Sequence, residues 1–205
     1  SIASTSSPSF ADVTLTTGSN STLATVGSQP TSMVNKQYVD NLAAGLDIHE
    51  SMRVLQQAVL SANYVQTQAA GSAATSAYLI STAQVALPAI DGVTISATGT
   101  SQRVLVVGGF NGTASIAGTT PFTPGNSFIG NGSYFVVALG GAGTSNWILR
   151  RTTDADDNIE LTGGTFTFIE EGTSYSDSGW VCSNDTLNLG SIQFGSTPIT
   201  FTQFT

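Results

Sequence analysis

Hydrophobic and polar residues alternate with a period of two along many short stretches of the chain, which is the pattern of half-buried β-strands. The clearest stretches are residues 103–107, 133–138, 146–151, 165–170, 179–183 and 198–204. A further clear strand is expected at 92–96, and the alternation at 46–55 also predicts a strand. Gly- and Asn-rich turns separate these stretches at short intervals, as in all-β folds. The pattern therefore predicts a mainly β protein with an antiparallel β sandwich or small barrel.

Two segments give no clean period. Residues 56–90 are rich in Ala, Gln and Ser, so a short helix and irregular strands both remain open. Residues 108–130 form a Gly/Thr/Pro stretch that is too long for an ordinary connection, which predicts a projecting loop. Phe110, Phe122 and Phe128 lie in this stretch and are candidate contacts with another surface.

One helix is expected, at residues 30–45. Thr31 or Ser32 can cap its start, and Gly45 can end it in a left-handed conformation. A helix of roughly thirteen residues is marginal alone in water, so it needs a partner surface.

The helix would carry one narrow apolar stripe. Val34, Tyr38 and Leu42 recur every four residues, with Val39 beside them. The stripe can either lie on the chain's own β domain or meet copies of itself around a symmetry axis. In the second case, these four residues are the oligomer contacts.

Three regions follow from these patterns. Residues 1–29 are a Ser/Thr-rich connector with two weak strand signals, residues 30–46 are the helix and a candidate junction between copies, and residues 47–205 are a β-rich domain. Short strands without a packed face are marginal, so the connector needs a neighbour. The chain starts with Ser1 rather than Met, which is consistent with trimming or with a piece of a longer protein.

The charge of the chain argues against polyanionic partners. The chain of 205 residues has a net charge of -8, and only 9% of its residues are charged. Five Lys and Arg residues cannot neutralise several phosphates, so we expect no nucleic-acid binding. No apolar run reaches the length of a spanning helix, so no membrane insertion is expected. The single cysteine excludes an internal disulfide, which suits synthesis in a reducing cytoplasm.

Acidic residues cluster most densely just after the strand expected at 146–151. Asp154, Asp156 and Asp157 are the weak metal candidates, with Asn158 and Glu160 beside them, because hard oxygen ligands suit a cation such as calcium. Ile159 stands where a calcium loop needs glycine, so a solvated turn is the favoured interpretation and no metal is expected.

No active site is expected. Glu170, Glu171 and Asp177 are the best carboxylates for a glycosidase, but neighbouring strand residues point to opposite faces. His49 and Cys182 have no supporting partner, and a buried inert thiol is the simpler interpretation. The chain is therefore expected to need no cofactor and to catalyse no reaction.

Two sets of motifs resemble bacteriophage tail-fibre and related virion appendage proteins. PTS at residues 30–32 with NKQYVD at 35–40 resembles a recurring helix of phage fibres. The second set is similar, in order, to a β domain of phage and large-virus structural proteins. Its clearest segments are GLDIHESMRV (45–54), FIEEGT (168–173), DSGWVC (177–182) and ITFTQF (199–204).

This resemblance implies a virion structural protein, most simply a tail-fibre subunit that forms a homotrimer through the helix. The family's helix has the same spacing of apolar positions, which favours the trimer seam. Implied partners are other copies, other virion proteins and a host-surface glycan or protein. The alternatives are a glycan-binding or glycan-degrading receptor-binding protein and a capsid decoration protein. The implied location is the virion, after synthesis in the host cytoplasm.

Overall fold

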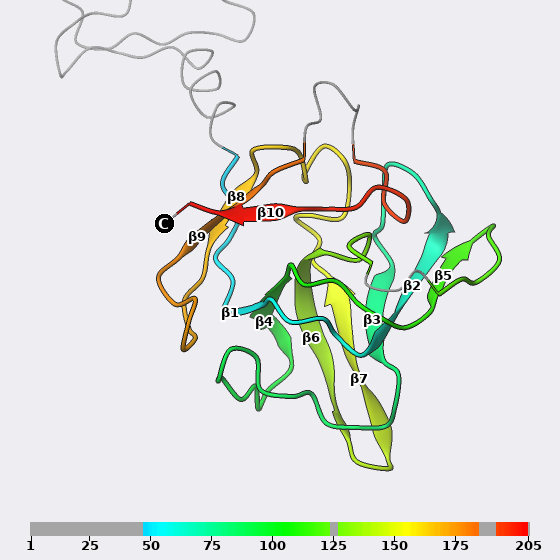
Figure 1. Cartoon of the computed structure of the whole chain (residues 1–205), viewed down its shortest axis with the longest axis horizontal. Coiled ribbons are helices and arrows are strands. Elements are labelled where there is room, and N and C mark those ends of the chain that lie inside the picture. Colours follow the sequence, from blue (N-terminus) through cyan, green and yellow to red (C-terminus); the bar gives the residue numbers. More distant parts are fainter. Residues whose placement is uncertain (1–46, 124–126, 185–191, 205) are drawn as a thin grey trace, which may run out of the picture. The chain divides into compact units, whose positions relative to one another are not determined.

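The computed structural model describes residues 47–123, 127–184 and 192–204, all of which belong to one compact unit that begins at Leu46. The described residues form ten strands in two sheets, so the expectation of a mainly β protein is confirmed (Figure 1). The connector at 1–29 and the helix at 30–46, with the contacts Val34, Tyr38, Val39 and Leu42, lie outside the described residues. These expectations stay predictions.

The larger sheet has seven strands. In spatial order they are β1 (Val54–Gln56), β4 (Gly99–Val106), β6 (Gly132–Gly141), β7 (Ser145–Arg151), β3 (Ala77–Ser81), β2 (Ala62–Ala69) and β5 (Ala114–Ala117). The central pairs are antiparallel, whereas β1 runs parallel to β4 and β5 runs parallel to β2. The sheet is therefore mixed rather than wholly antiparallel, and the described strands do not close into a barrel.

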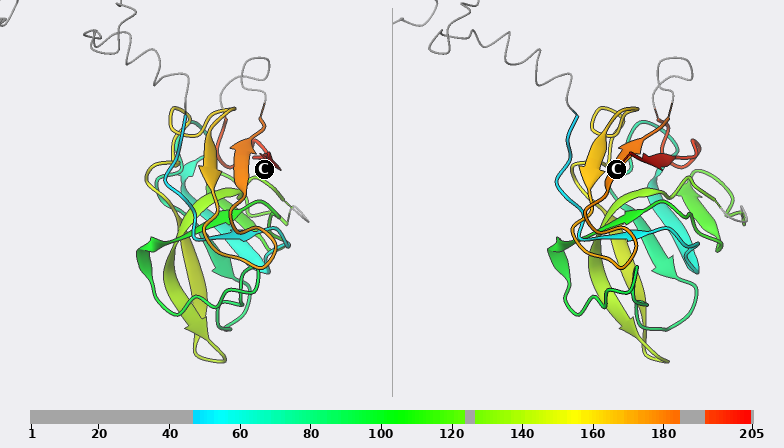
Figure 2. Two further views of the ribbon diagram at one scale, coloured as in Figure 1. Left: turned by 90° about the vertical axis from the view of Figure 1, so that its left-hand side faces the viewer. Right: turned by 60° about the vertical axis from the view of Figure 1, so that its left-hand side comes forward.

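The smaller sheet is antiparallel, with β9 (Gly179–Cys182) between β10 (Phe201–Gln203) and β8 (Phe166–Phe168). The beginning of the described chain extends it, because Ile48 pairs with Phe166 and Met52 with Ile169 in parallel bridges. The same stretch then continues as β1 along β4 (Figure 2). One extended segment thus borders both sheets.

Strand β1 also explains how the two sheets pack. Val54 and Leu55 are both buried, and their side chains belong to different cores. Val54 joins the main core of the larger sheet, where Tyr64 and Phe110 stack with ring centroids 5.7 Å apart. Leu55 joins a second core with Met52, Leu105, Ile169 and Trp180. This second core fills the space between the smaller sheet and the β1–β4 edge.

In the first half of the described chain, one open alternative is resolved and one expected strand is missing. Residues 56–90, left open between helix and strands, contain the antiparallel pair β2 and β3. The strand expected at 92–96 is absent, because residues 90–93 make a tight turn instead. Asp91 and Gly92 have φ angles of 47° and 81°, the left-handed values of a tight turn that reverses the chain between Ile90 and Val93.

The projecting loop expected at residues 108–130 is largely wrong. The segment contains β5, and backbone hydrogen bonds join Phe110 to Ser127 and Ala114 to Phe122. Phe110 is fully buried against Tyr64, so it cannot contact another surface. The pattern missed this because small residues and glycines allow the chain to lie close against β2. Phe122 and Phe128 remain exposed, at 42% and 41%, and their surface role stays a prediction.

Candidate interaction surface

The outer side of the smaller sheet is apolar. Neighbouring strands place Phe166 beside Ile48 on one side and beside Val181 on the other. Phe168 follows on the same side of β8, since side chains two apart share a face. Phe204 reaches this face from the end of β10 and contacts both rings of β8. We call these five residues (Ile48, Phe166, Phe168, Val181 and Phe204) the outer apolar face.

The three phenylalanine rings of the face form one cluster. Phe166 meets Phe168 and Phe204 edge to face, at centroid distances of 6.0 and 5.9 Å, and Phe168 lies 6.1 Å from Phe204. Such edge-to-face pairs are favourable beyond the area that they bury. A shallow depression lies among Phe166, Val181 and Phe204. The rings therefore hold each other in place while two of them stay about half exposed.

Strand β8 reverses the usual pattern of a sheet that borders water. Thr167 points inward, is 3% exposed and donates through Oγ1 to the carbonyl of Glu50 at 2.9 Å. Phe168 points outward and is 45% exposed. A sheet with one solvated side normally presents polar residues there. The exposed phenylalanines are therefore the informative feature of this sheet.

Charged residues lie beside the smaller sheet rather than on its strands. Strands β8, β9 and β10 contain no Asp, Glu, Lys or Arg. Glu171, beyond β8, receives two hydrogen bonds from Arg53, at 3.0 and 3.2 Å. Arg103 contacts Glu50 at 3.3 Å and Asp154 at 2.6 Å. These ion pairs therefore lie outside the three strands of the smaller sheet.

The turn at residues 90–93 anchors the loop between β8 and β9. The carboxylate of Asp91 accepts the backbone N–H of Ser174 at 3.0 Å and that of Tyr175 at 2.9 Å, and the Asp91 carbonyl accepts the N–H of Thr173 at 2.9 Å. Gly172, with φ of 150°, lies against this carboxylate, where a β-carbon would approach Oδ2 to 2.1 Å. Asp91, together with Gly172 of the FIEEGT motif, thus holds the turn at residues 90–93 against the loop between β8 and β9.

Two of the weak metal candidates, Asp154 and Asp157, each bind protein groups through one carboxylate oxygen. Burial opposes ionisation of Asp154, but hydrogen bonds from Thr152 and Arg103 outweigh it and hold its pKa below the usual value. Asp157 accepts the backbone N–H of Ile159 at 2.8 Å and that of Glu160 at 2.9 Å. Within the described ranges, no three His, Cys, Asp or Glu side chains are grouped to hold a metal ion.

Asp156 is the carboxyl with the most perturbed pKa of this cluster. Burial, together with the nearby charges of Glu160 and Asp157, raises its pKa to about 6. The positive charge of Arg151 lowers the pKa of Asp156, but by less than burial and the neighbouring carboxylates raise it.

Arg151 itself belongs to the core. Its guanidinium lies between the rings of Tyr134 and Phe194, at 5.0 and 4.9 Å from their centroids. Nη2 donates to the carbonyl of Asn131 and to the hydroxyl of Tyr134, both at 3.0 Å. Burial in turn raises the pKa of Tyr134. This cation is fully buried and serves the packing of the larger sheet.

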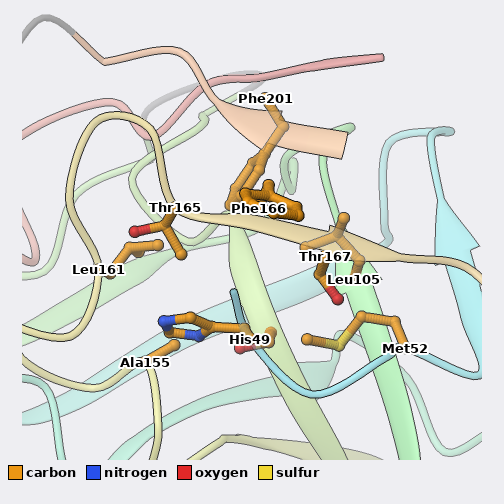
Figure 3. A pocket seen from close by; sticks show the side chains of 10 residues that line it. His49, Met52, Leu105, Ala155, Leu161, Thr165, Phe166, Thr167 and Phe201 are labelled. Atoms are coloured by element: carbon orange, nitrogen blue, oxygen red, sulfur yellow. The ribbon is translucent and has the colours of Figure 1, made fainter. Parts of the chain in front are cut away.

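A small cavity lies beside His49, between the two sheets (Figure 3). Its volume of about 10 Å³ is at most enough for one water molecule. His49 Nε2 lies 3.5 Å from Oδ1 of Asp47, whose Oδ2 accepts hydrogen bonds from the hydroxyls of Thr162, at 3.1 Å, and Thr165. Asp47 therefore joins the first described residues to the turn before β8, and the cavity has no room for a substrate.

Cys182 is also unsuited to nucleophilic chemistry. It is buried, and burial raises the pKa of its thiol to about 11. Reactive cysteines need the opposite shift, because the thiolate is the nucleophile. The interpretation of Cys182 as a buried thiol is consistent with this geometry.

A groove of about 570 Å³ lies where residues 56–61 and 82–88 approach Trp147. Such a volume is within the range of small-molecule sites. Its lining includes Gln56, Ser61 and Thr82 but no Asp, Glu, Lys, Arg or His. The groove could hold a neutral ligand and offers no group for acid–base chemistry.

Sequence reasoning placed strands at the outer apolar face but did not single out its residues. Phe166 and Phe168 lie in the stretch expected as a strand, and Phe204 in the last one. The signal available in the sequence was the Phe-Thr-Phe alternation with a polar residue at its centre. That pattern defines two faces without telling which one is covered.

Comparison with known proteins gives no relative: no family model, curated protein or solved structure matches this chain. Nowhere in the described ranges is there a helix with the length and apolar character needed to cross a bilayer.

Proposed function

We propose that this protein is a structural subunit of a phage tail fibre or a related virion appendage. It works as a homotrimer whose seam is formed by Val34, Tyr38, Val39 and Leu42, and it displays the β unit that begins at residue 47. Its partners are other copies and other virion proteins, and its role is mechanical and adhesive. The resemblance of the chain's motifs, in their order, to those of phage fibre proteins suggests this function.

The observation that carries the proposal is the outer apolar face. Two of its phenylalanines, Phe168 and Phe204, are 45% and 49% exposed, and Ile48 is 56% exposed. Exposed apolar patches rimmed by polar groups are typical of surfaces that contact other macromolecules. The motif residues Glu171 and Gly172 hold loops together, through Arg53 and through Asp91 of the turn at residues 90–93. This supports a scaffold role for the motifs.

The alternative is a glycan-binding or glycan-degrading protein. The groove at Trp147 favours binding, because its size and neutral polar groups suit a sugar. Degradation has less support, since glycosidases place two carboxyls across the scissile bond. Glu171 is instead paired with Arg53, and Glu170 accepts a hydrogen bond from Ser51. We therefore propose no reaction and no cofactor for the described residues.

The function is tested on intact particles and on host polysaccharide. Mass spectrometry of purified virions should detect the chain in copy numbers that are multiples of three. Incubation with host polysaccharide should release no reducing ends. Saturable binding without cleavage that is lost in Ser61→Trp, which fills the groove, would favour the lectin. Release of reducing ends would overturn the structural role.

A further inference from the structure

Arg150 has an unpaired guanidinium. Among the residues that the structure describes, no hydrogen bond or ion pair reaches this group. By contrast, Arg53 and Arg103 pair with carboxylates, and Arg151 lies buried between two rings. An unpaired arginine is unexpected in a chain with 13 Asp and Glu against 5 Lys and Arg. We propose that the groove beside Arg150 binds the carboxylate of a sugar acid.

Strand β7 places Arg150 on the outer side of the larger sheet. Its neighbours Leu149 and Arg151 are buried, whereas Arg150 is partly exposed. In the ladder, Arg150 pairs with Tyr78 of β3 on one side and with Phe135 of β6 on the other. Residues directly opposite each other in a ladder have β-carbons about 4.5–5.5 Å apart. Arg150 therefore stands between two aromatic residues in a row across the sheet.

The groove lies where the strand pairing is irregular. Gly99 pairs with Val136 and Arg103 with Phe135, so four residues of β4 span only one residue of β6. A second register shift, between β6 and β7, also begins at Val136. Such bulges are common beside functional sites, because they turn side chains out of the regular pleat. Here they border a groove of about 260 Å³ with Arg150 in its lining.

The charge of the groove fits one carboxylate. Its lining contains Arg150 but no Asp, Glu, Lys or His. Arg103, the next cation in the same row, already pairs with Glu50 and Asp154. A guanidinium presents a planar fork of N–H donors that matches the two oxygens of a carboxylate. Because the net charge of -8 repels anions at long range, a ligand with one negative charge is favoured over a polyanion.

The other groups of the groove suit a sugar ring. Thr98 and Thr100 are exposed, and their hydroxyls have no hydrogen-bond partner among the described residues. Phe135 and Val137 add apolar surface for the C–H face of a ring. Small-molecule sites combine an apolar lining with a few polar groups in the same way. An Asp or Glu side chain of another protein would use Arg150 and leave both hydroxyls without a ligand group, so the sugar acid is the better fit.

The experiment titrates glucuronate into the full chain and follows binding by saturation-transfer difference NMR. For a ligand of this size we expect a Kd of about 1 mM. In Arg150→Gln, the Kd should rise about tenfold or more, because the charged hydrogen bonds are lost. The matched control is Arg53→Gln, which removes the same charge from the pair with Glu171, outside the groove, and should change the Kd less than about twofold.

A second variant blocks the groove and keeps Arg150. The carboxylate introduced by Thr100→Glu can pair with the arginine within the chain and should also raise the Kd about tenfold or more. Thr120→Glu adds the same charge at an exposed position outside the groove and should change the Kd less than about twofold. Far-UV circular dichroism checks the fold of each variant. If Arg150→Gln does not fold, Thr100→Glu decides the result.

Three results would overturn the inference. The first is no binding of glucuronate to the wild type at about 50 mM. The second is an unchanged Kd in folded Arg150→Gln or in Thr100→Glu. The third is a competitor that binds as tightly as glucuronate, either glucose, which lacks the carboxylate, or N-acetylglutamate amide, which represents a protein side chain.

The inference goes beyond the proposed function and does not rest on it. A monomeric chain that binds glucuronate through Arg150 would keep the inference and overturn the trimer. A trimeric chain that binds no glucuronate would overturn the inference and leave the trimeric function standing.

Discussion

The ring of Phe204 lies directly over Gly179. A β-carbon at position 179 would come within 2.3 Å of Cζ of Phe204, and the N–H of Phe204 donates to the carbonyl of Gly179 at 2.9 Å. Glycine at this position therefore lets the last aromatic residue of the outer apolar face lie flat against β9. The ring is held from below by the sheet and from the side by Phe166 and Phe168.

Gly179→Ala should displace the Phe204 ring. Because this ring is close to the end of the chain, it can swing away, and the free energy of unfolding should change by less than about 1 kcal/mol. The measurement is the set of ring resonances of Phe204 in the NMR spectrum, which should shift strongly. Gly71→Ala is the control, since a β-carbon there meets only one atom, at 3.9 Å. Unchanged Phe204 resonances in Gly179→Ala would contradict the packing.

Asn131 is predicted to be a stability centre. Its side chain is 1% exposed and accepts the N–H of Gly109 at 2.9 Å, while Nδ2 donates to the carbonyls of Val107 and Ile199 at 2.9 and 2.8 Å. Asn131→Ala leaves these buried groups unpaired and should lower the free energy of unfolding by about 3 kcal/mol. Chemical denaturation measures this loss. Asn111→Ala, at an exposed position, should stay within about 0.5 kcal/mol of the wild type.

The strand content was predictable because it depends on local alternation. Residues 145–151 alternate inward and outward, so Trp147 and Leu149 could be assigned to the core from the sequence. Strand pairing was not predictable in this way. The parallel contact of β1 with β4 joins Val54 to Val104, and no local pattern specifies which distant strand will be the neighbour.

The candidate site was predictable only in part, for a different physical reason. Alternation in β8 separates Phe166 and Phe168 from Thr167, and hydrophobicity alone would place the phenylalanines inside. The structure places Thr167 inside, where Glu50 satisfies its hydroxyl. Asn131 precedes a glycine, and such an Asn-Gly pair indicates only a turn, so its three distant hydrogen-bond partners cannot be recognised from the sequence.

Asp91 should control the order of the loop between β8 and β9. Asp91→Ala removes the acceptor for the N–H groups of Ser174 and Tyr175 and should speed hydrogen exchange at both amides by about tenfold. Asp91→Asn keeps one side-chain oxygen and tolerates the positive φ, so it should retain most of the protection. Equal exchange in the two variants would contradict this role.

Stability should depend on pH through Asp156. Its folded pKa of about 6 lies above the usual value for an unfolded Asp, about 3.9, so the folded state holds this proton more tightly. The resulting stabilisation is complete below about pH 4 and is lost as pH rises through 6. Asp156→Asn should therefore raise the melting temperature at pH 8 and change it little at pH 4. A melting temperature at pH 8 that is equal to or lower than that of the wild type would contradict the burial argument.

The most direct test of the account is the mass of the purified full chain in solution, determined by light scattering. We expect the wild-type chain to have three times the chain mass of 21.0 kDa, and the double variant Tyr38→Asp, Leu42→Asp to have a mass of 21.0 kDa. A wild-type chain that stays at 21.0 kDa at every concentration would contradict it.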